Sequence, residues 1–214
     1  MSLHQVTRLL MLAALALLTA ACISVDIGKD TAQQSQFRIA DSAAPPVAVA
    51  RSNGRELVVA PQPASSIDDS FSLAFSRQPG QRAAYQFASW SDRPSSRLAQ
   101  LLVDRLAARR SFGSVALAGR GVAGDLLLNL SVSDFFHDAT ASPGSASVTV
   151  EVELIDRATR KLIARQSFAA SAPVSAANSA AAAAALGVAS TKVLDDVVAW
   201  VESKAAPSAL ASAR

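Results

Sequence analysis

Apolar residues alternate with polar ones along much of the second half of the chain. Every second position is apolar in two segments, first Leu126, Leu128, Leu130 and Val132, and then Val148, Val150, Val152 and Leu154. A third segment follows a polar turn and begins at Lys161. Side chains of a strand point alternately to its two faces, so this pattern is typical of half-buried strands. We expect three long strands that form an antiparallel meander with one polar face.

Shorter strands are expected earlier in the chain. Apolar or alternating runs occupy residues 36–39, 71–76, 83–88 and 115–117. Residues 47–50 and 56–59 flank Asn53–Gly54, a dipeptide that supplies the positive φ angles of a tight turn. A β-hairpin is therefore predicted around that dipeptide.

Two segments have helical periodicity. Leu98, Leu101, Leu102 and Leu106 recur at intervals of three and four after Pro94, and proline is tolerated in a first helical turn. The second segment runs from the alanine-rich residues 180–185 through Val193, Val197 and Val201. Ser175 or Asn178 caps it, and Pro207 ends it. The element order predicts an α/β (α+β) fold, a two-layer sandwich with a mainly antiparallel sheet and two principal helices on one face.

The N-terminus has the pattern of a secretory signal. Arg8 precedes a short apolar run from Leu9 to Leu18, and small residues then lead to Cys22. The run is too short for a comfortable transmembrane helix, which needs about 20 apolar residues. Cys22 is the only cysteine of the chain, so an intrachain disulfide and a cysteine metal cluster are excluded.

A sole cysteine after small residues resembles a lipobox, although Thr19 stands where leucine is commoner. In lipobox chemistry the signal is cut before Cys22, which carries acyl chains such as palmitate. Several acyl chains make a stable membrane anchor. By analogy with lipoprotein sorting, Ile23 in place of Asp favours the outer membrane. The alternative is an ordinary secretion signal with an incidental thiol.

These observations divide the chain into four parts. Residues 1–21 are the signal peptide, 22–35 a lipidated tether, 36–204 a single domain, and 205–214 a disordered tail. Positive and negative residues are interspersed and the formal net charge is only +3. Nucleic-acid binding is therefore not expected.

Residues with catalytic chemistry are scarce. His137 is the one histidine after the signal, and we interpret it as an exposed residue at a polar strand end. Asp68–Asp69 and Asp195–Asp196 are interpreted as solvated surface. Residues 119–124 resemble a glycine-rich phosphate loop but run into a strand where such a loop needs a helix. We predict no catalytic residue, no metal site and no cofactor.

Tyr85 and Trp90 are open to two interpretations. Both stand just before the first predicted helix. They form either part of the core beneath that helix or a contact with a partner, since both residue types are enriched at interfaces.

The order of these features resembles the ABC-type transport auxiliary lipoproteins, which include the lipoprotein of paraquat-inducible, mammalian-cell-entry-type systems. The resemblance rests on Cys22, then Phe37-Arg38-Ile39 where the family tends to have Tyr-x-Leu, Tyr85, the Trp90-x-x-x-Pro94 helix start, the three long strands and Trp200. Phe37 in place of tyrosine is a mild departure.

The resemblance implies a non-enzymatic auxiliary subunit of an ABC-type transporter of lipids or other hydrophobic compounds. Such a lipoprotein sits on the periplasmic face of the outer membrane, held by its lipid anchor. It docks a mammalian-cell-entry-type substrate-binding protein and its transporter, and the resemblance leaves room for a lipid ligand. Two other hypotheses remain: a structural or assembly lipoprotein of another envelope export machine, and a periplasmic hydrolase that depends on His137.

Overall fold

The computed structural model describes residues 33–43, 48–49, 52–63 and 67–206. The predicted signal peptide, Cys22, most of the predicted tether and residues 207–214 lie outside these ranges. The chain from Gln34 onward forms one compact unit, which is described below.

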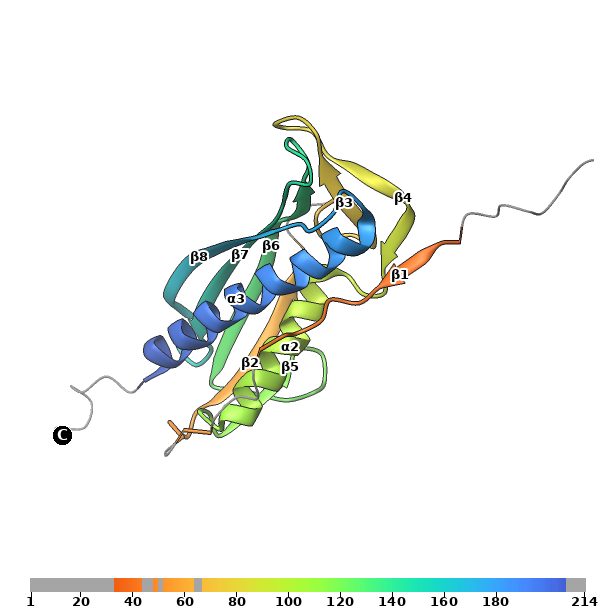
Figure 1. The fold of residues 1–214 in the computed structure, drawn as a ribbon. Helices are drawn as coiled ribbons and strands as arrows, with labels where there is room; N and C mark the ends of the chain where they lie inside the picture. The colour runs from red at the N-terminus through yellow and green to blue at the C-terminus, as the bar shows by residue number, and fades with distance from the viewer. Residues whose placement is uncertain (1–32, 44–47, 50–51, 64–66, 207–214) are drawn as a thin grey trace, which may run out of the picture. The chain divides into compact units, whose positions relative to one another are not determined.

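Eight strands and two helices occur in the described residues (Figure 1). The strands are β1 (Ser35–Phe37), β2 (Glu56–Gln62), β3 (Ser72–Ser76), β4 (Ala83–Trp90), β5 (Ser114–Leu117), β6 (Leu126–Asp138), β7 (Ser145–Asp156) and β8 (Lys161–Pro173). The helices are α2 (Pro94–Arg109) and α3 (Ser179–Ala205). The prediction of an α+β fold is confirmed, and each predicted run from 56 onward corresponds to one of these elements.

β6 is the strand around which the sheet is built. Along one edge it pairs with β7, and β7 pairs with β8, both antiparallel. This confirms the predicted meander. Its other edge is divided between two parallel partners, β2 beside residues 126–131 and β3 beside residues 136–138. β5 then extends the β2 branch, whereas β4 and β1 extend the β3 branch. The sheet is therefore mixed, and its longest ladders are antiparallel.

The predicted hairpin around Asn53–Gly54 is wrong. β2 begins just after this dipeptide, but its two edges are filled by β5 and β6, both parallel to it. Residues 48–49 and 52–55 form no strand. Local turn chemistry suggested a hairpin, but pairing with two distant strands leaves β2 no free edge for one.

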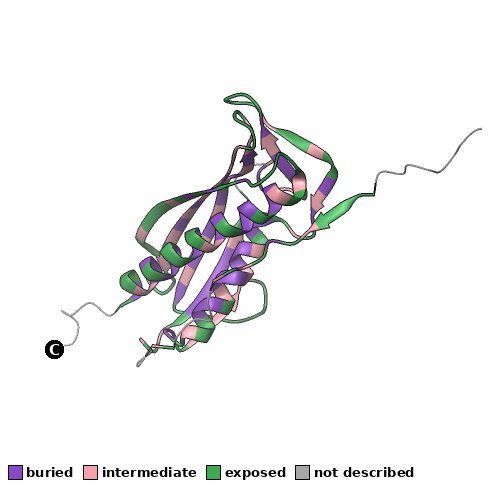
Figure 2. Ribbon diagram, in the orientation of Figure 1, coloured by how far each residue is buried: buried purple, intermediate pink, exposed green. Residues whose placement is uncertain are grey.

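Both helices pack on the same face of the sheet, as predicted (Figure 1). α3 lies across β7 and β8, and α2 lies against β2 and β5. The residues buried between the layers are mainly the alternating apolar positions of β6 and β7 and the apolar stripes of the helices (Figure 2). No helix in the described part of the chain is long and apolar enough to cross a membrane.

The segment after β1 lies between the two helices and contacts both. Ile39 is buried there, and its carbonyl accepts a hydrogen bond from Arg97 of α2. Gly187 of α3 admits the segment, because a Cβ at this position would lie 3.2 Å from the carbonyl oxygen of Ala40. The chain next to the predicted tether is thus fixed between α2 and α3.

Arg105 joins the segment and the two helices. Its side chain, only 6% exposed, donates two hydrogen bonds to the carboxylate of Asp41. It also donates to the Thr191 carbonyl and, at 2.7 Å, to Asp195. Asp195 and Asp196 are exposed, which confirms their interpretation as surface residues.

The two helices begin with different caps. Asn178 caps α3, and its side chain accepts a hydrogen bond from the Ala181 amide. The residue before α2 is Arg93, which provides no side-chain cap. Instead Asp69 accepts bonds from the Ser95 amide at 2.8 Å and the Ser95 hydroxyl at 2.7 Å. A carboxylate from a distant loop therefore satisfies this helix start and complements its dipole.

Replacement of Arg105 by Met is expected to lower the free energy of unfolding at neutral pH by about 3 kcal/mol, since it leaves the Asp41 carboxylate without its partner. The hydrogen bond from Arg105 lowers the pKa of Asp41 from its ordinary 3.8. The stabilisation is therefore fully present above that value and is lost as the pH falls through the lowered folded-state pKa. Urea unfolding should show a difference between wild type and Arg105→Met that shrinks below about pH 4.

The matched control is Arg38→Met, which removes an exposed ion pair with Asp92. This change should cost less than about 1 kcal/mol. Equal destabilisation by the two variants would contradict the role given to Arg105.

Substitution of Asp69 by Ala should destabilise the protein by about 1–2 kcal/mol, because it removes the cap of α2. Hydrogen exchange should show reduced protection of the Ser95 amide, which loses its acceptor. Ser95→Ala, which removes only the hydroxyl bond, is the milder comparison. Unchanged protection of the Ser95 amide in Asp69→Ala would contradict the assignment of Asp69 as the cap.

Candidate functional site

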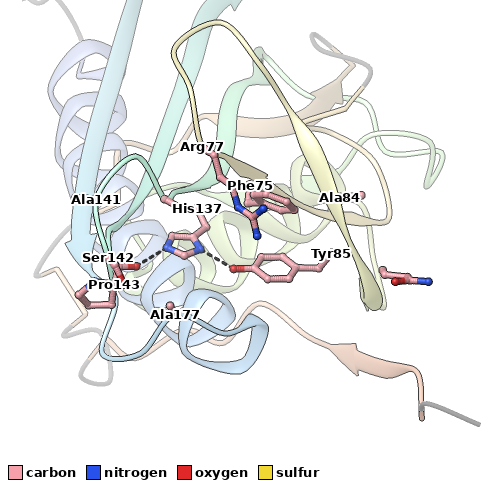
Figure 3. Close-up of a pocket in the computed structure, with 11 residues that line it drawn as sticks. Phe75, Arg77, Ala84, Tyr85, His137, Ala141, Ser142, Pro143 and Ala177 are labelled. Carbon is pink, nitrogen blue, oxygen red and sulfur yellow. Dashed lines mark hydrogen bonds between the residues drawn. The ribbon is translucent and has the colours of Figure 1, made fainter. Parts of the chain in front are cut away.

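A pocket of about 430 Å³ lies at the C-terminal end of β6 (Figure 3). Its walls come from the β3–β4 hairpin, from the turn between β6 and β7, and from the residue before the N-cap of α3. The lining residues are Phe75, Arg77, Ala84, Tyr85, Gln86, His137, Ala139, Ala141, Ser142, Pro143 and Ala177. Segments far apart in the sequence therefore meet at this end of the sheet.

His137 forms the floor of the pocket and is 1% exposed. Its Nε2 lies 2.7 Å from the Pro143 carbonyl oxygen, and its Nδ1 lies 2.7 Å from the Tyr85 hydroxyl (Figure 3). A carbonyl oxygen only accepts, so Nε2 carries the proton and donates it. Nδ1 and the Tyr85 hydroxyl share the second hydrogen bond. Both ring nitrogens are thus satisfied.

The interpretation of His137 as an exposed residue is wrong, and a β-bulge in β6 is the reason. The pairing of β6 with β7 shifts between Val132 and Asp134, so Ser133 is an extra residue. One extra residue moves every later side chain of the strand to the opposite face. Beyond the bulge Phe135 and His137 are buried, whereas before it the even-numbered residues from Leu126 to Val132 are.

The β6–β7 turn approaches His137 closely, and Gly144 makes this possible. A Cβ at Gly144 would lie 2.1 Å from the Asp138 carbonyl oxygen and 2.9 Å from His137 Nε2. Its φ of +86° is also unfavourable for other residues. The pocket wall depends on this backbone contact.

Tyr85 and Trp90 lie in different surroundings. Trp90 is 1% exposed in the core, and its ring meets Phe135 edge to face with centroids 5.5 Å apart. Tyr85 is half-buried, and its ring lies 4.9 Å from that of Phe75, between centroids, at the pocket wall. Burial raises the pKa of the Tyr85 hydroxyl, and the nearby Arg77 opposes this rise. Tyr85 thus remains in its donor form at neutral pH.

The solvated interpretation of Asp68–Asp69 is wrong, because both residues are buried. Asp69 is the cap of α2. Asp68 lies 3.2 Å from Arg82, whose guanidinium also bonds Asp134 and stacks on the Phe136 ring. Burial raises the pKa of Asp68, and the Arg82 charge opposes the rise. Each carboxylate of the pair serves a separate structural contact, so the two do not form an acid–base pair.

The sequence pattern does not connect His137 with Tyr85, and nothing in it marks Phe75, Arg77 or Ala177. These residues are ordinary in their local sequence, and only the fold brings them to one pocket. Among the described residues, no three His, Cys, Asp or Glu side chains are grouped to hold a metal ion. Cys22, the predicted lipidation site, lies outside the described residues.

Replacement of His137 by Phe should destabilise the protein by about 2–3 kcal/mol, since Tyr85 and the Pro143 carbonyl lose a buried partner. Tyr85→Phe removes one of the two bonds and should cost about 1 kcal/mol. Urea unfolding of both single variants and the double variant should give a coupling energy of about 1 kcal/mol. Strictly additive effects would show that the bond between Tyr85 and His137 contributes nothing.

Comparison with solved structures shows the same fold elsewhere. A Xanthomonas campestris protein of the DUF330 family has 23% identity and a TM-score of 0.69 over 79% of this chain and 96% of that one. An uncharacterized protein has 15% identity and a TM-score of 0.60 over 79% of this chain and 99% of that one. No curated protein matches the chain.

One protein family matches the sequence over residues 37–198, which include both helices in large part and all strands from β2 to β8. That family is described as the ABC-type transport auxiliary lipoprotein component. The match covers most of the chain and agrees with the resemblance found in its sequence. The chain therefore belongs to the ABC-type transport auxiliary lipoprotein family.

Proposed function

We propose that this protein is the auxiliary lipoprotein of an ABC-type transporter of lipids or other hydrophobic compounds, of the mammalian-cell-entry type. It is anchored through Cys22 to the periplasmic face of the outer membrane. There it docks the substrate-binding component of the system, which is rooted in the other membrane. The observation that carries the proposal is the family match over residues 37–198.

The sequence around Cys22 supports the anchor. The secretory pattern ends in small residues directly before this sole cysteine, which resembles a lipobox. Membership of a lipoprotein family supports the same assignment. Ile23 after the cysteine supports the outer membrane as the destination.

A docking role without catalysis fits the side chains of the domain. Both ring nitrogens of the one histidine of the domain form hydrogen bonds within the fold, one with the Tyr85 hydroxyl and one with the Pro143 carbonyl. The sheet face opposite the helices carries polar contacts across three strands, where Arg165 pairs with Glu151 and Glu153, and Asn129 donates to Glu153. Such a face suits a protein partner better than acyl chains. Apolar cargo would then pass mainly through other subunits.

Lipidation is tested by expression of the wild type and Cys22→Ala in a Gram-negative host. The wild type should sediment with membranes and band with the outer membrane on a density gradient, and mass spectrometry should show an acylated mature N-terminus at Cys22. Cys22→Ala should move to the soluble fraction. An unmodified Cys22, or cleavage elsewhere, would refute the anchor.

The partner is tested by affinity isolation from detergent-solubilised membranes of the native host. Recovery of a mammalian-cell-entry-type protein together with its ATPase is the expected result. Recovery of secretin or polymer-export proteins instead would support the assembly-lipoprotein hypothesis and overturn this one. If the protein binds this partner but carries no lipid, the anchor is wrong and the docking role stands.

A further inference from the structure

The pocket at the end of β6 has one cationic side chain at its rim. Arg77 follows β3 directly, and its guanidinium carbon lies 5.1 Å from the centroid of the Phe75 ring. Arg82, on the same hairpin, is paired with Asp68 and Asp134. Among the described residues, by contrast, no carboxylate forms an ion pair with Arg77. Its charge is therefore available to a ligand.

The remaining wall is mostly apolar. Two aromatic rings, four alanines and one proline contribute to it: Phe75, Tyr85, Ala84, Ala139, Ala141, Ala177 and Pro143. Alanine side chains leave the space open because they are too short to fill it. The polar groups at the floor do not compete for a ligand, since His137 and the Tyr85 hydroxyl bond each other. Figure 3 shows the Arg77 guanidinium beside the Phe75 ring and close to Tyr85.

The volume limits the size of the ligand. A pocket of about 430 Å³ falls within the range of small-molecule sites. Its size suits a small amphiphile, such as a carboxylate with a chain of roughly ten carbons, and excludes a phospholipid with two acyl chains.

We propose that this pocket binds a monoanionic amphiphile, namely a medium-chain fatty acid, with its carboxylate at Arg77 and its chain against Phe75, Tyr85 and the alanines. A carboxylate matches the fork of the guanidinium, and an apolar chain matches the wall. The pocket belongs to the lipoprotein domain itself, so this inference does not depend on which transporter the protein joins.

Binding is tested by isothermal titration calorimetry on the full mature chain with the substitution Cys22→Ala. This variant carries no acyl chains, so the titration needs no detergent. The probes are hexanoate, octanoate, decanoate and tetradecanoate below their micelle concentrations, with 1-decanol as the uncharged counterpart of decanoate. Affinity should rise about fourfold per methylene up to decanoate and then level off as the pocket fills. Decanol should bind about tenfold more weakly than decanoate.

Three substitutions locate the site. Arg77→Gln should weaken decanoate about tenfold and leave decanol unchanged, because decanol has no charge to pair with the guanidinium. Ala177→Phe should weaken both ligands by filling the pocket from an exposed loop position. Arg120→Gln is the matched control, since this exposed arginine lies in the loop before β6, at the other end of that strand. Equal melting temperatures of the variants show that the fold is kept.

Several results would overturn the inference. These are a continued rise in affinity beyond decanoate, equal binding of decanol and decanoate, or the same loss in Arg120→Gln as in Arg77→Gln. Equal binding of decanol and decanoate would show that the Arg77 charge contributes nothing, and the other two results would indicate binding that is not specific to this pocket. An acetylated peptide with a C-terminal leucine is a further probe. If this peptide binds and decanoate does not, the pocket recognises a protein C-terminus and the fatty-acid assignment is wrong.

Discussion

The extra residue at Ser133 determines which side chains β6 turns toward the helices. Before it, leucine and valine positions follow the simple alternation of a half-buried strand. After it the alternation continues in the opposite phase, so Phe135 and His137 become interior residues. β7 carries no such shift at its valines, which stay buried throughout. Because of the bulge, β6 buries its leucines and valines in the core and also buries the His137 imidazole at the end of the sheet.

The same part of β6 is where the sheet divides. β2 pairs with its first half and β3 with its last three residues, so the β3–β4 hairpin reaches the far end of the strand. That placement brings Tyr85 to His137 and Phe75 beside both. The β6–β7 turn completes the enclosure because Gly144 permits its backbone to contact His137. The pocket is consequently a product of the bulge, the divided edge and one glycine.

Buried polar contacts hold the rest of the domain together across long sequence separations. Arg105 links Asp41 to α3, Asp69 caps α2, and Asp68 meets Arg82. None of these pairs has a local sequence signal, since each partner by itself resembles a surface charge. For that reason the sequence pattern at Asp68–Asp69 indicates solvated surface although both side chains are buried. By contrast Asp195 and Asp196, which have the same local pattern, do lie at the surface.

The sequence by itself determined the fold class, the three long strands, both helices and the family. Those features depend on the periodicity of apolar side chains. This periodicity is a local property, and it can be recognised without knowing which strands or helices pack together. The tertiary structure alone decided the parallel pairing of β2, the burial of His137 and the pocket beside it. The physical reason is that strand pairing and polar burial depend on which distant groups satisfy a hydrogen bond. A single added residue in β6 reverses the face of every side chain after it, and the alternation before Ser133 gives no sign of this change.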